Sequence, residues 1–273
     1  MSPNADKVRV PLTIAGSDPS GGAGLQADLK VFLRFGLSGA AVPTAITVQS
    51  PAGVRSVHAL PAGLLARQLA VLLADVRPAA VKVGLLPDAD AVRAVARAIA
   101  PLARLKIPIV VDPVLCASDG TRFLPRDAVP VFLRHLVPLA TLLTPNIAEA
   151  AELAGTDERH VREVTDEVVA TLCTAGARAV LIKGGHGSGD ESTDVLGTRR
   201  GMTLYSLPRV PRRRRVHGTG CALAAAIAAM LARGSSLEEA VQGAKAFVAQ
   251  AIAGARHVGR GSRQLDFLAQ NDD

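Results

Sequence analysis

The sequence of 273 residues contains no tryptophan and a single tyrosine, Tyr205, and aromatic side chains make up only 3% of it. Proteins that bind single-stranded nucleic acid usually offer aromatic side chains on which bases stack. We therefore expect no nucleic-acid partner, although the formal net charge is +7. That charge is local, because the segment 199–215 holds seven arginines and no Asp or Glu. Runs of charge are usually solvated loops, the interpretation we favour for most of these arginines.

Three cysteines, Cys116, Cys173 and Cys221, are too few and too irregularly spaced for a disulfide framework or a zinc site. No window approaches the roughly 18 uninterrupted apolar residues of a membrane span, and the start of the chain lacks the apolar stretch of a secretory signal. We expect a cytoplasmic protein with no membrane partner. With 49% apolar residues, the chain can bury the core of a single domain comprising residues 1–273.

Short runs rich in Val, Ile and Leu alternate with longer stretches of helical period. Such alternation is typical of an α/β fold in which helices cover both faces of a mostly parallel sheet, a three-layer α/β/α sandwich. Strands are predicted at 10–16, 42–48, 79–85, 107–112, 140–145 and 178–184, with a late edge pair at 193–198 and 202–210. Helices are predicted at 23–36, 62–75, 88–104, 127–137, 147–154, 165–175, 219–233 and 237–256, the last begun by a capping box of Ser236 and Glu239.

Polar residues and glycines follow six of the predicted strands. In open parallel sheets, ligands bind beyond the carboxyl ends of the strands, so these residues are expected to meet at one site. Taken singly, Lys183 is equally well a surface lysine, and Asp112 before Pro113 an ordinary turn former. The residues concerned are Gly16 with Ser17 and Asp18, Gln49, Gly84, Asp112, Asn146 with Glu149, and Lys183 with Gly184 and Gly185.

The segment HGTGC (217–221) stands directly before an alanine-rich helix. The first N–H groups of a helix lack intrahelical partners, and two glycines let an anion approach the backbone, so the turn suits phosphate. Alternatively, Thr219 simply caps the helix, and these five residues alone do not decide. Cys221 is either a small buried hydrophobe or, with a pKa lowered by the helix N-terminus, a proton acceptor. Cys116 and Cys173 have no activating neighbour and are assigned to packing.

A second glycine-dense turn, GSDPSGGAG (16–24), fits neither the dinucleotide-binding nor the P-loop pattern. By itself it is best interpreted as a flexible connector. Asp28, four residues into the following helix, is by the same local argument a favourable charge near a helix start.

Taken together, the segments 13–30, 44–50, 81–86, 110–115, 142–155, 180–186 and 217–229 closely resemble bacterial hydroxymethylpyrimidine/phosphomethylpyrimidine kinases of the thiamine pathway. These enzymes belong to the ribokinase-like superfamily. The most specific features are TIAGSDPSGGAGLQADLK and the cysteine of Gly-Thr-Gly-Cys, where most sugar kinases of the superfamily have Asp. The resemblance implies a ribokinase-like sandwich that phosphorylates 4-amino-5-hydroxymethyl-2-methylpyrimidine with ATP, and then its monophosphate. A pyridoxine or pyridoxal kinase is the alternative, and a catalytically silent binding protein is a more distant one.

The resemblance also implies roles for individual residues and a homodimer. Residues 211–215 and the ending 259–267 depart from the family pattern; the arginines either assist nucleotide binding or, as we favour, are solvated. The implied roles are pyrimidine binding by Gly16, Asp28 and Gln49, Mg²⁺ binding by Asp112, Asn146 and Glu149, and charge neutralisation by Lys183. ATP would be bound by Lys183, Gly184, Gly185, Thr219 and Gly220, with Gly218, Thr219 and Gly220 as catalytic backbone donors and Cys221 as the base.

Overall fold

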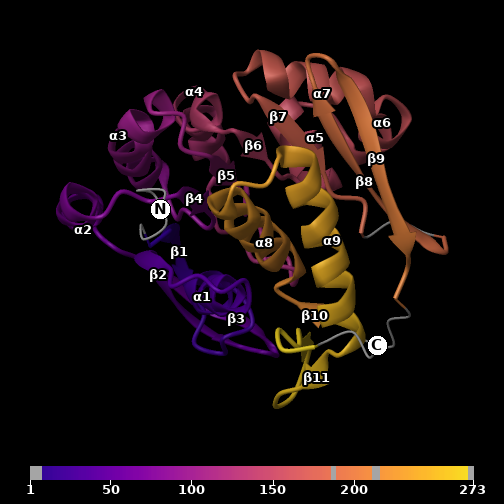
Figure 1. Ribbon diagram of the computed structural model, residues 1–273, viewed down its shortest axis with the longest axis horizontal. Helices are drawn as coiled ribbons and strands as arrows, with labels where there is room; N and C mark the ends of the chain where they lie inside the picture. Colours follow the sequence, from indigo (N-terminus) through magenta and orange to yellow (C-terminus); the bar gives the residue numbers. More distant parts are fainter. Residues whose placement is uncertain (1–7, 186–188, 211–215, 270–273) are drawn as a thin grey trace, which may run out of the picture.

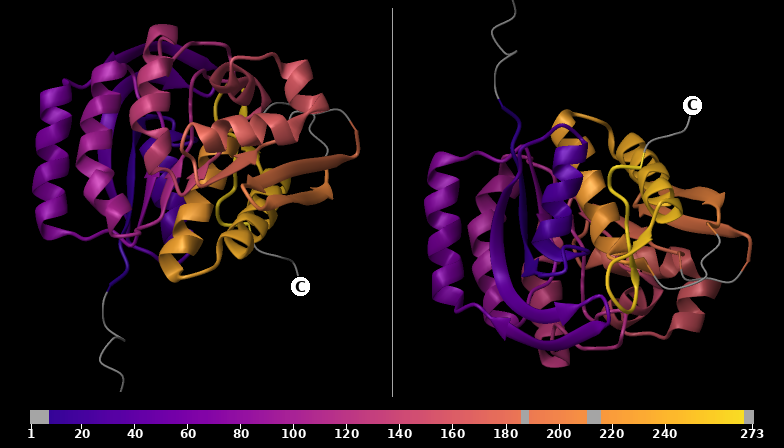
Figure 2. Two further views of the ribbon diagram at one scale, coloured as in Figure 1. Left: turned by 90° about the horizontal axis from the view of Figure 1, so that it is seen from above. Right: turned by 90° about the horizontal axis from the view of Figure 1, so that it is seen from below.

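The chain folds into a nine-stranded sheet between two layers of helices (Figures 1 and 2). The computed structural model describes residues 8–185, 189–210 and 216–269. The elements in chain order are β1 (Pro11–Ser17), α1 (Gly24–Arg34), β2 (Ala40–Ser50), β3 (Gly53–Ala59), α2 (Ala62–Asp75), β4 (Ala80–Val83), α3 (Ala89–Arg104), β5 (Ile109–Val111), α4 (Val129–His135), β6 (Leu142–Leu143), α5 (Ile147–Ala154), α6 (Glu158–Glu163), α7 (Thr165–Thr174), β7 (Ala179–Ile182), β8 (Glu191–Thr198), β9 (Gly201–Pro208), β10 (Val216–His217), α8 (Thr219–Arg233), α9 (Leu237–Ala253), β11 (Arg256–His257) and β12 (Arg263–Gln264). Short 3₁₀ turns at Arg126–Ala128 and Val137–Leu139 flank α4.

The strand order is β3-β2-β1-β4-β5-β6-β7-β8-β9. The six strands from β2 to β7 in this order run parallel to one another, whereas β3 at one edge and the β8–β9 hairpin at the other pair antiparallel. The predicted mostly parallel sandwich with a late edge pair is therefore confirmed. A parallel sheet brings the carboxyl ends of its strands to one edge, which places the predicted ligand residues together.

Alternate residues of the central strands face two different cores. Val81 and Val83 pack into the core formed with α2, α3, α4, α5 and α7, while Ala80 packs on the opposite side with α1, α8 and α9. Strand β5 repeats this division, with Ile109 and Val111 on the first side and Val110 on the second. Because both faces are covered, these strands do not alternate with polar residues, and Lys82 of β4 is the one polar residue in the two strands.

Helix α8 is alanine-rich because it is surrounded. It packs against α1 and α9 and lies across strands β1, β4 and β5. Alanine side chains allow this close approach on several sides at once, and Gly234 ends the helix in the left-handed conformation at φ 98°. Its N-terminus is thereby fixed at the carboxyl edge of the sheet.

Three features were not predicted. Strand β3 and helix α6 were missed, and a small second sheet in the order β10-β12-β11 brings the C-terminal segment beside the start of α8. The last helix ends at Ala253, before the predicted position 256, while its predicted capping box is present. Among the helices of the described ranges, none combines the length and apolar character that a membrane crossing needs.

Candidate functional site

A cavity of about 520 Å³ opens at the carboxyl edge of the sheet. Every site residue predicted from the sequence lines it except Asp28, Gly84 and Gly184. The parallel strands converge there with the N-terminal turn of α8, so residues from both halves of the chain share one space. The cavity is therefore the candidate active site.

Lys183 lies at the centre of a charged cluster in this cavity. Its Nζ is 2.7 Å from Asp112 Oδ1 and 3.9 Å from Glu149 Oε2. Thr144 also donates to Asp112 Oδ1, at 3.0 Å. Burial by itself would lower the pKa of Lys183, but the charges of Asp112 and Glu149 outweigh it and raise that pKa above its ordinary value. Lys183 is thus a fixed cation at the end of β7, not a surface lysine.

Asn146 and Glu149 form a capping box at the start of α5. Asn146 Oδ1 accepts from the backbone N–H of Glu149 at 2.9 Å, and Glu149 Oε2 accepts from that of Asn146 at 2.8 Å. The side-chain oxygen of Asn146 thus accepts one hydrogen bond from the helix, which leaves its second lone pair for the metal role predicted for it, and the same box positions Glu149. Burial raises the pKa of Glu149 to about 7, with Lys183 opposing the shift and Asp112 adding to it.

The N-terminal turn of α8 presents backbone donors to the cavity. Gly218, at φ 82°, precedes the helix, and its carbonyl takes the first helical bond, from Ala222 N–H at 2.9 Å. No carbonyl or side chain in the described part of the chain accepts from the N–H groups of Thr219, Gly220 or Cys221. These donors are available to an anion. Thr219 does not cap the helix through its side chain, so the alternative capping interpretation is wrong.

Both glycines of this turn have close neighbours, and Gly218, at φ 82° against a backbone oxygen, is the one that requires glycine. A Cβ on Gly220 would lie 3.3 Å from Lys183 Nζ and 3.9 Å from Asp112 Oδ2. A Cβ on Gly218 would lie 1.8 Å from the carbonyl oxygen of Gly22, in the first glycine-dense turn. The turn before α8 therefore packs directly on the turn after β1 and reaches the Lys183 cluster, which joins the two halves of the site.

Cys221 lies in the first turn of α8, where burial raises its pKa to about 11. The cation of Lys82 opposes this shift, while the nearby carboxylates Asp112 and Asp28 reinforce it. The prediction that the helix N-terminus lowers the pKa of this thiol is wrong, because desolvation of the thiolate outweighs it.

Asp28 is entirely buried beneath the cavity floor. Its Oδ2 accepts from Lys82 Nζ at 2.8 Å and from Thr13 Oγ1 at 2.6 Å. The carboxylate has no exposed surface, so the prediction that Asp28 contacts the pyrimidine is wrong. Lys82, which does line the cavity, was overlooked, although a lysine between the valines of a buried strand could have drawn attention to it.

At the opposite edge of the cavity, Gly184 donates its N–H to Asp194 Oδ1 at 2.9 Å. Asp194 in turn pairs with Lys245 of α9 at 2.7 Å. The amide of Gly184 is therefore engaged within the protein and is not free to donate to ATP, whereas Gly185, also predicted to bind ATP, lines the cavity. The apolar side chains of Leu223, Val248 and Ile252 form the neighbouring wall.

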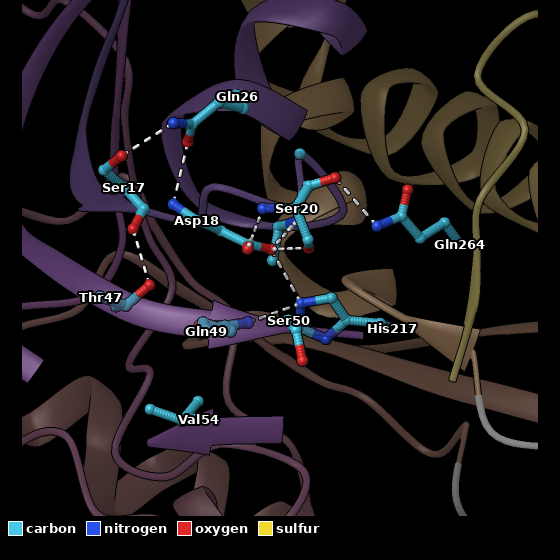
Figure 3. A network of polar contacts seen from close by, with 12 residues as sticks. Ser17, Asp18, Ser20, Gln26, Thr47, Gln49, Ser50, Val54, His217 and Gln264 are labelled. Carbon is cyan, nitrogen blue, oxygen red and sulfur yellow. Dashed lines mark hydrogen bonds and ion pairs between the residues drawn. The ribbon is translucent and has the colours of Figure 1, made fainter. Parts of the chain in front are cut away.

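Gln49 at the end of β2 contacts His217, as Figure 3 shows. The Nε2 atoms of the two side chains are 2.9 Å apart, and His217 Nε2 is also 3.0 Å from Asp18 Oδ2. Burial by itself would raise the pKa of Asp18, but hydrogen bonds from His217 and Ser20 outweigh it and keep that pKa below its ordinary value. The sequence placed Asp18 and His217 in the two glycine turns but assigned neither of them a role.

Two predictions about other residues also changed. Cys173 is buried in the core as expected, but Cys116 is exposed and lines the cavity, so its assignment to packing is wrong. Arg209 is not a solvated arm, because its guanidinium donates to the carbonyl oxygens of Gly185, Gly189 and Glu191. Residues 212–215, the arginine run considered for nucleotide binding, lie outside the described residues.

The sequence profile described as phosphomethylpyrimidine kinase matches residues 18–266. The chain belongs to this family. It is 43% identical over 252 residues to the hydroxymethylpyrimidine/phosphomethylpyrimidine kinase of Rhizobium meliloti, covering 90% of this chain and 91% of that protein. It is 40% identical over 265 residues to the thiamine biosynthesis bifunctional protein ThiED of Geobacter sulfurreducens, covering 96% of this chain and 53% of that protein. The chain thus spans about half the length of that relative.

Solved structures agree with this membership and confirm the ribokinase-like fold expected from the resemblance. The phosphomethylpyrimidine kinase of Clostridium difficile superposes with a TM-score of 0.76 at 34% identity, covering 89% of this chain and 99% of that one. The pyridoxal kinase of Staphylococcus aureus in complex with AMP-PCP and pyridoxal superposes with a TM-score of 0.85 at 31% identity, covering 97% and 96%. The two kinds of kinase thus share the scaffold.

In a member of this family, the close packing of the two glycine turns gives a direct prediction. Gly218→Ala places a methyl group 1.8 Å from Gly22 O, so the turn must move by roughly 1 Å, a displacement that can cost about 10²-fold in rate. We expect kcat to fall by about that factor in a steady-state kinase assay. The control is Gly36→Ala, at φ 74°, where a Cβ meets nothing within 4 Å. Equal losses in both variants would contradict the role assigned to the contact.

Proposed function

We propose that the protein transfers the γ-phosphoryl group of ATP to the hydroxymethyl oxygen of 4-amino-5-hydroxymethyl-2-methylpyrimidine and then phosphorylates the resulting monophosphate. The observation that carries this proposal is the meeting, in one cavity, of Lys183, the unbonded N–H groups of residues 219–221 and Gln49. Phosphoryl transfer depends on positioning and charge stabilisation more than on covalent protein chemistry, and these groups supply both.

The nucleotide is proposed to lie along the α8 turn. Helix N-termini bind phosphate through free N–H groups and the positive end of the helix dipole. The wall formed by Leu223, Val248 and Ile252 offers an apolar surface for the base. The related Staphylococcus aureus structure, which contains AMP-PCP, supports use of ATP by this scaffold.

Magnesium is proposed to be held by Asp112 and Glu149. Within the described ranges, no three His, Cys, Asp or Glu side chains converge as a complete metal site. Mg²⁺ commonly takes only one or two carboxylates and completes its octahedron with water and substrate phosphates, so the two carboxylates fit this ion. Asp112 Oδ2 faces Gly220, at the point where phosphate is expected. When bound, the ion would neutralise phosphate charge.

The residues around the acceptor have separate tasks. Gly16 and Gln49 hold the pyrimidine, and Cys221 receives the proton that the hydroxymethyl oxygen loses as it bonds to phosphorus. Lys183 and the N–H groups of residues 219–221 stabilise the negative charge on the transferring phosphoryl oxygens. ADP leaves with the electrons of the broken oxygen–phosphorus bond.

A coupled assay of ADP release tests this function with three acceptors: the hydroxymethylpyrimidine, its monophosphate and pyridoxal. We expect turnover with the first two and a much lower kcat/KM with pyridoxal. A higher kcat/KM with pyridoxal would assign the chain to the activity named for its Staphylococcus aureus neighbour. Absence of turnover with all three would exclude kinase activity on these acceptors. The single domain over residues 1–273, the cytoplasmic location, the homodimer and the lack of a nucleic-acid partner stay predictions.

A further inference from the structure

His217 makes two polar contacts through a single ring nitrogen. Its Nε2 lies 3.0 Å from Asp18 Oδ2 and 2.9 Å from the end of the Gln49 side chain (Figure 3). A ring nitrogen either carries a hydrogen and donates or lacks one and accepts, so both contacts must be satisfied by the same state. Which state it takes decides how the amide of Gln49 is turned.

The surroundings of Asp18 settle the state of His217. Asp18 Oδ1 accepts from Ser20 N–H at 2.9 Å, and Oδ2 accepts from Ala23 N–H at 2.9 Å and Ser20 Oγ at 3.0 Å. An ionised carboxylate can only accept, and every one of these partners is a donor. An unprotonated Nε2 would set a lone pair against the carboxylate at 3.0 Å. His217 Nε2 therefore carries the hydrogen and donates to Asp18.

A donating Nε2 requires an acceptor from Gln49. With Gln49 Nε2 at 2.9 Å, two N–H donors face each other and neither finds an acceptor. Half a turn of the amide about its last C–C bond exchanges nitrogen and oxygen with almost no change of shape. Gln49 Oε1 then shares, as a second acceptor, the one N–H that His217 donates to Asp18 Oδ2, and the NH₂ group is left for the cavity.

We propose that His217 is a positioning residue that holds Gln49 Oε1 and thereby determines which ring edge the site selects. The inference rests on the proposed role of Gln49 in binding the pyrimidine. In this orientation the NH₂ group donates to the ring nitrogen, and the second lone pair of Oε1 accepts from the neighbouring 4-amino group. The amide and the aminopyrimidine edge are then complementary at both atoms.

The same orientation disfavours pyridoxal. Beside its hydroxymethyl group, pyridoxal carries an aldehyde oxygen, which accepts, and next to it a phenolic hydroxyl, which donates. This order is the reverse of an amino group followed by a ring nitrogen. An amide fixed by His217 therefore pairs each donor with an acceptor on the aminopyrimidine, whereas on pyridoxal it faces donor with donor and acceptor with acceptor. Buried polar groups left unpaired in this way are the main source of such discrimination.

The position of His217 is itself tightly held. Its backbone pairs with Gln264 in the small sheet, and a Cβ on Gly22 would lie 2.9 Å from His217 Cδ2. The exposed fractions of the two side chains are 18% for His217 and 4% for Asp18. The C-terminal segment, the α8 turn and the first glycine turn thus together aim one N–H at Gln49.

The test compares His217→Leu with His217→Gln. Glutamine can place an N–H near the position of the histidine Nε2, whereas leucine cannot. We expect His217→Leu to raise KM for the hydroxymethylpyrimidine by about 10- to 100-fold, with a smaller change in kcat and a lower preference over pyridoxal. His217→Gln should restore most of both. An unchanged preference in His217→Leu, or no recovery in His217→Gln, overturns the inference.

Two further variants separate positioning from general loosening. Gln264→Leu removes another hydrogen bond of the same network, the one that Gln264 Nε2 donates to Ser20 O at 3.0 Å. Gln264 makes no hydrogen bond to Gln49 in the described structure. We expect it to leave the preference between acceptors unchanged, and a comparable loss of preference would overturn the inference. In a double-variant cycle, adding His217→Leu to Gln49→Leu should cause no further loss, whereas additive losses would show that His217 acts independently of Gln49.

The same cycle distinguishes a failure of this inference from a failure of the proposed function. If the unaltered protein phosphorylates the hydroxymethylpyrimidine and Gln49→Leu raises its KM, the proposed function and the role of Gln49 hold, and only the His217 variants decide the inference. If the unaltered protein does not act on this alcohol, the proposed function fails, and the inference is overturned with it.

Discussion

Replacement of Lys183 by methionine is expected to lower kcat by about 10³-fold, because in the proposed function Lys183 is the cation that stabilises the transferring phosphoryl group. Methionine keeps most of the side-chain volume while removing the charge. The Nζ of Lys183 lies 3.3 Å from the position of a Cβ on Gly220, in the turn that presents the free N–H groups. The effect should therefore fall on kcat, while KM for the hydroxymethylpyrimidine changes little.

The variant also leaves two carboxylates without their cation. Lys183 lowers the pKa of Glu149, which burial already raises to about 7, so its loss raises that pKa further and Glu149 takes up a proton at neutral pH. Proton uptake limits the stability lost, and thermal unfolding will measure what remains. Lys245→Met is the matched control, because it breaks a 2.7 Å buried lysine–aspartate pair elsewhere in the cavity. A kcat within tenfold of the unaltered protein for Lys183→Met would contradict the assigned role.

The layers of the fold could be predicted because short stretches of the sequence show by their apolar pattern which residues are buried. Runs such as residues 109–111 and 179–182 are apolar throughout, and stretches of 3.6-residue period alternate with such runs along the chain, so a parallel sheet covered on both faces follows. Strand β3 was missed because it lies at the edge and contains no fully buried residue. Strands β10, β11 and β12 contain two residues each, too few for any periodic signal.

The carboxyl-edge rule brought together most of the cavity residues, but local sequence could not reveal the pairs that cross the fold. Lys82 and Asp28 are 54 residues apart, and His217 lies 168 residues from Gln49 and 199 from Asp18. Nothing in the flanking residues specifies such partners. Asp28 was consequently expected to contact the ligand, whereas in the structure it forms an ion pair with Lys82. His217 was given no role, although it begins the HGTGC segment.

Replacement of Cys221 by alanine is expected to lower kcat by about 10²- to 10⁴-fold, the usual contribution of a general base. Some turnover should survive, because Lys183 and the N–H groups of the α8 turn remain in place. Cys221→Ser is the closest variant in size and tests whether the sulfur itself is needed, because a serine hydroxyl is a far weaker base than a thiolate. Retention of full turnover by the alanine variant would rule out the base role.

The pH dependence of kcat gives an independent test. A base acts in its deprotonated form, and burial raises the pKa of Cys221 to about 11, so the thiol is mostly protonated at neutral pH and its reactive fraction grows as the pH rises. We expect kcat of the unaltered protein to rise with pH through the neutral range, and this slope to disappear in Cys221→Ala. A slope that persists in the alanine variant would assign the titration to another group.

Replacing Lys82 is expected to change the pH at which kcat rises. Its cation lowers the pKa of Cys221 against the effect of burial, so neutralising it leaves the thiol harder to deprotonate. Lys82→Met is best combined with Asp28→Asn, because an unpaired buried carboxylate would otherwise destabilise the fold. The combined variant removes both the Lys82 cation, which lowers the pKa of Cys221, and the Asp28 charge, which raises it. The influence of Lys82 is the larger, so the net effect is a higher pKa. The rising limb of kcat should therefore shift to higher pH, and a shift to lower pH would show that Lys82 does not act on Cys221.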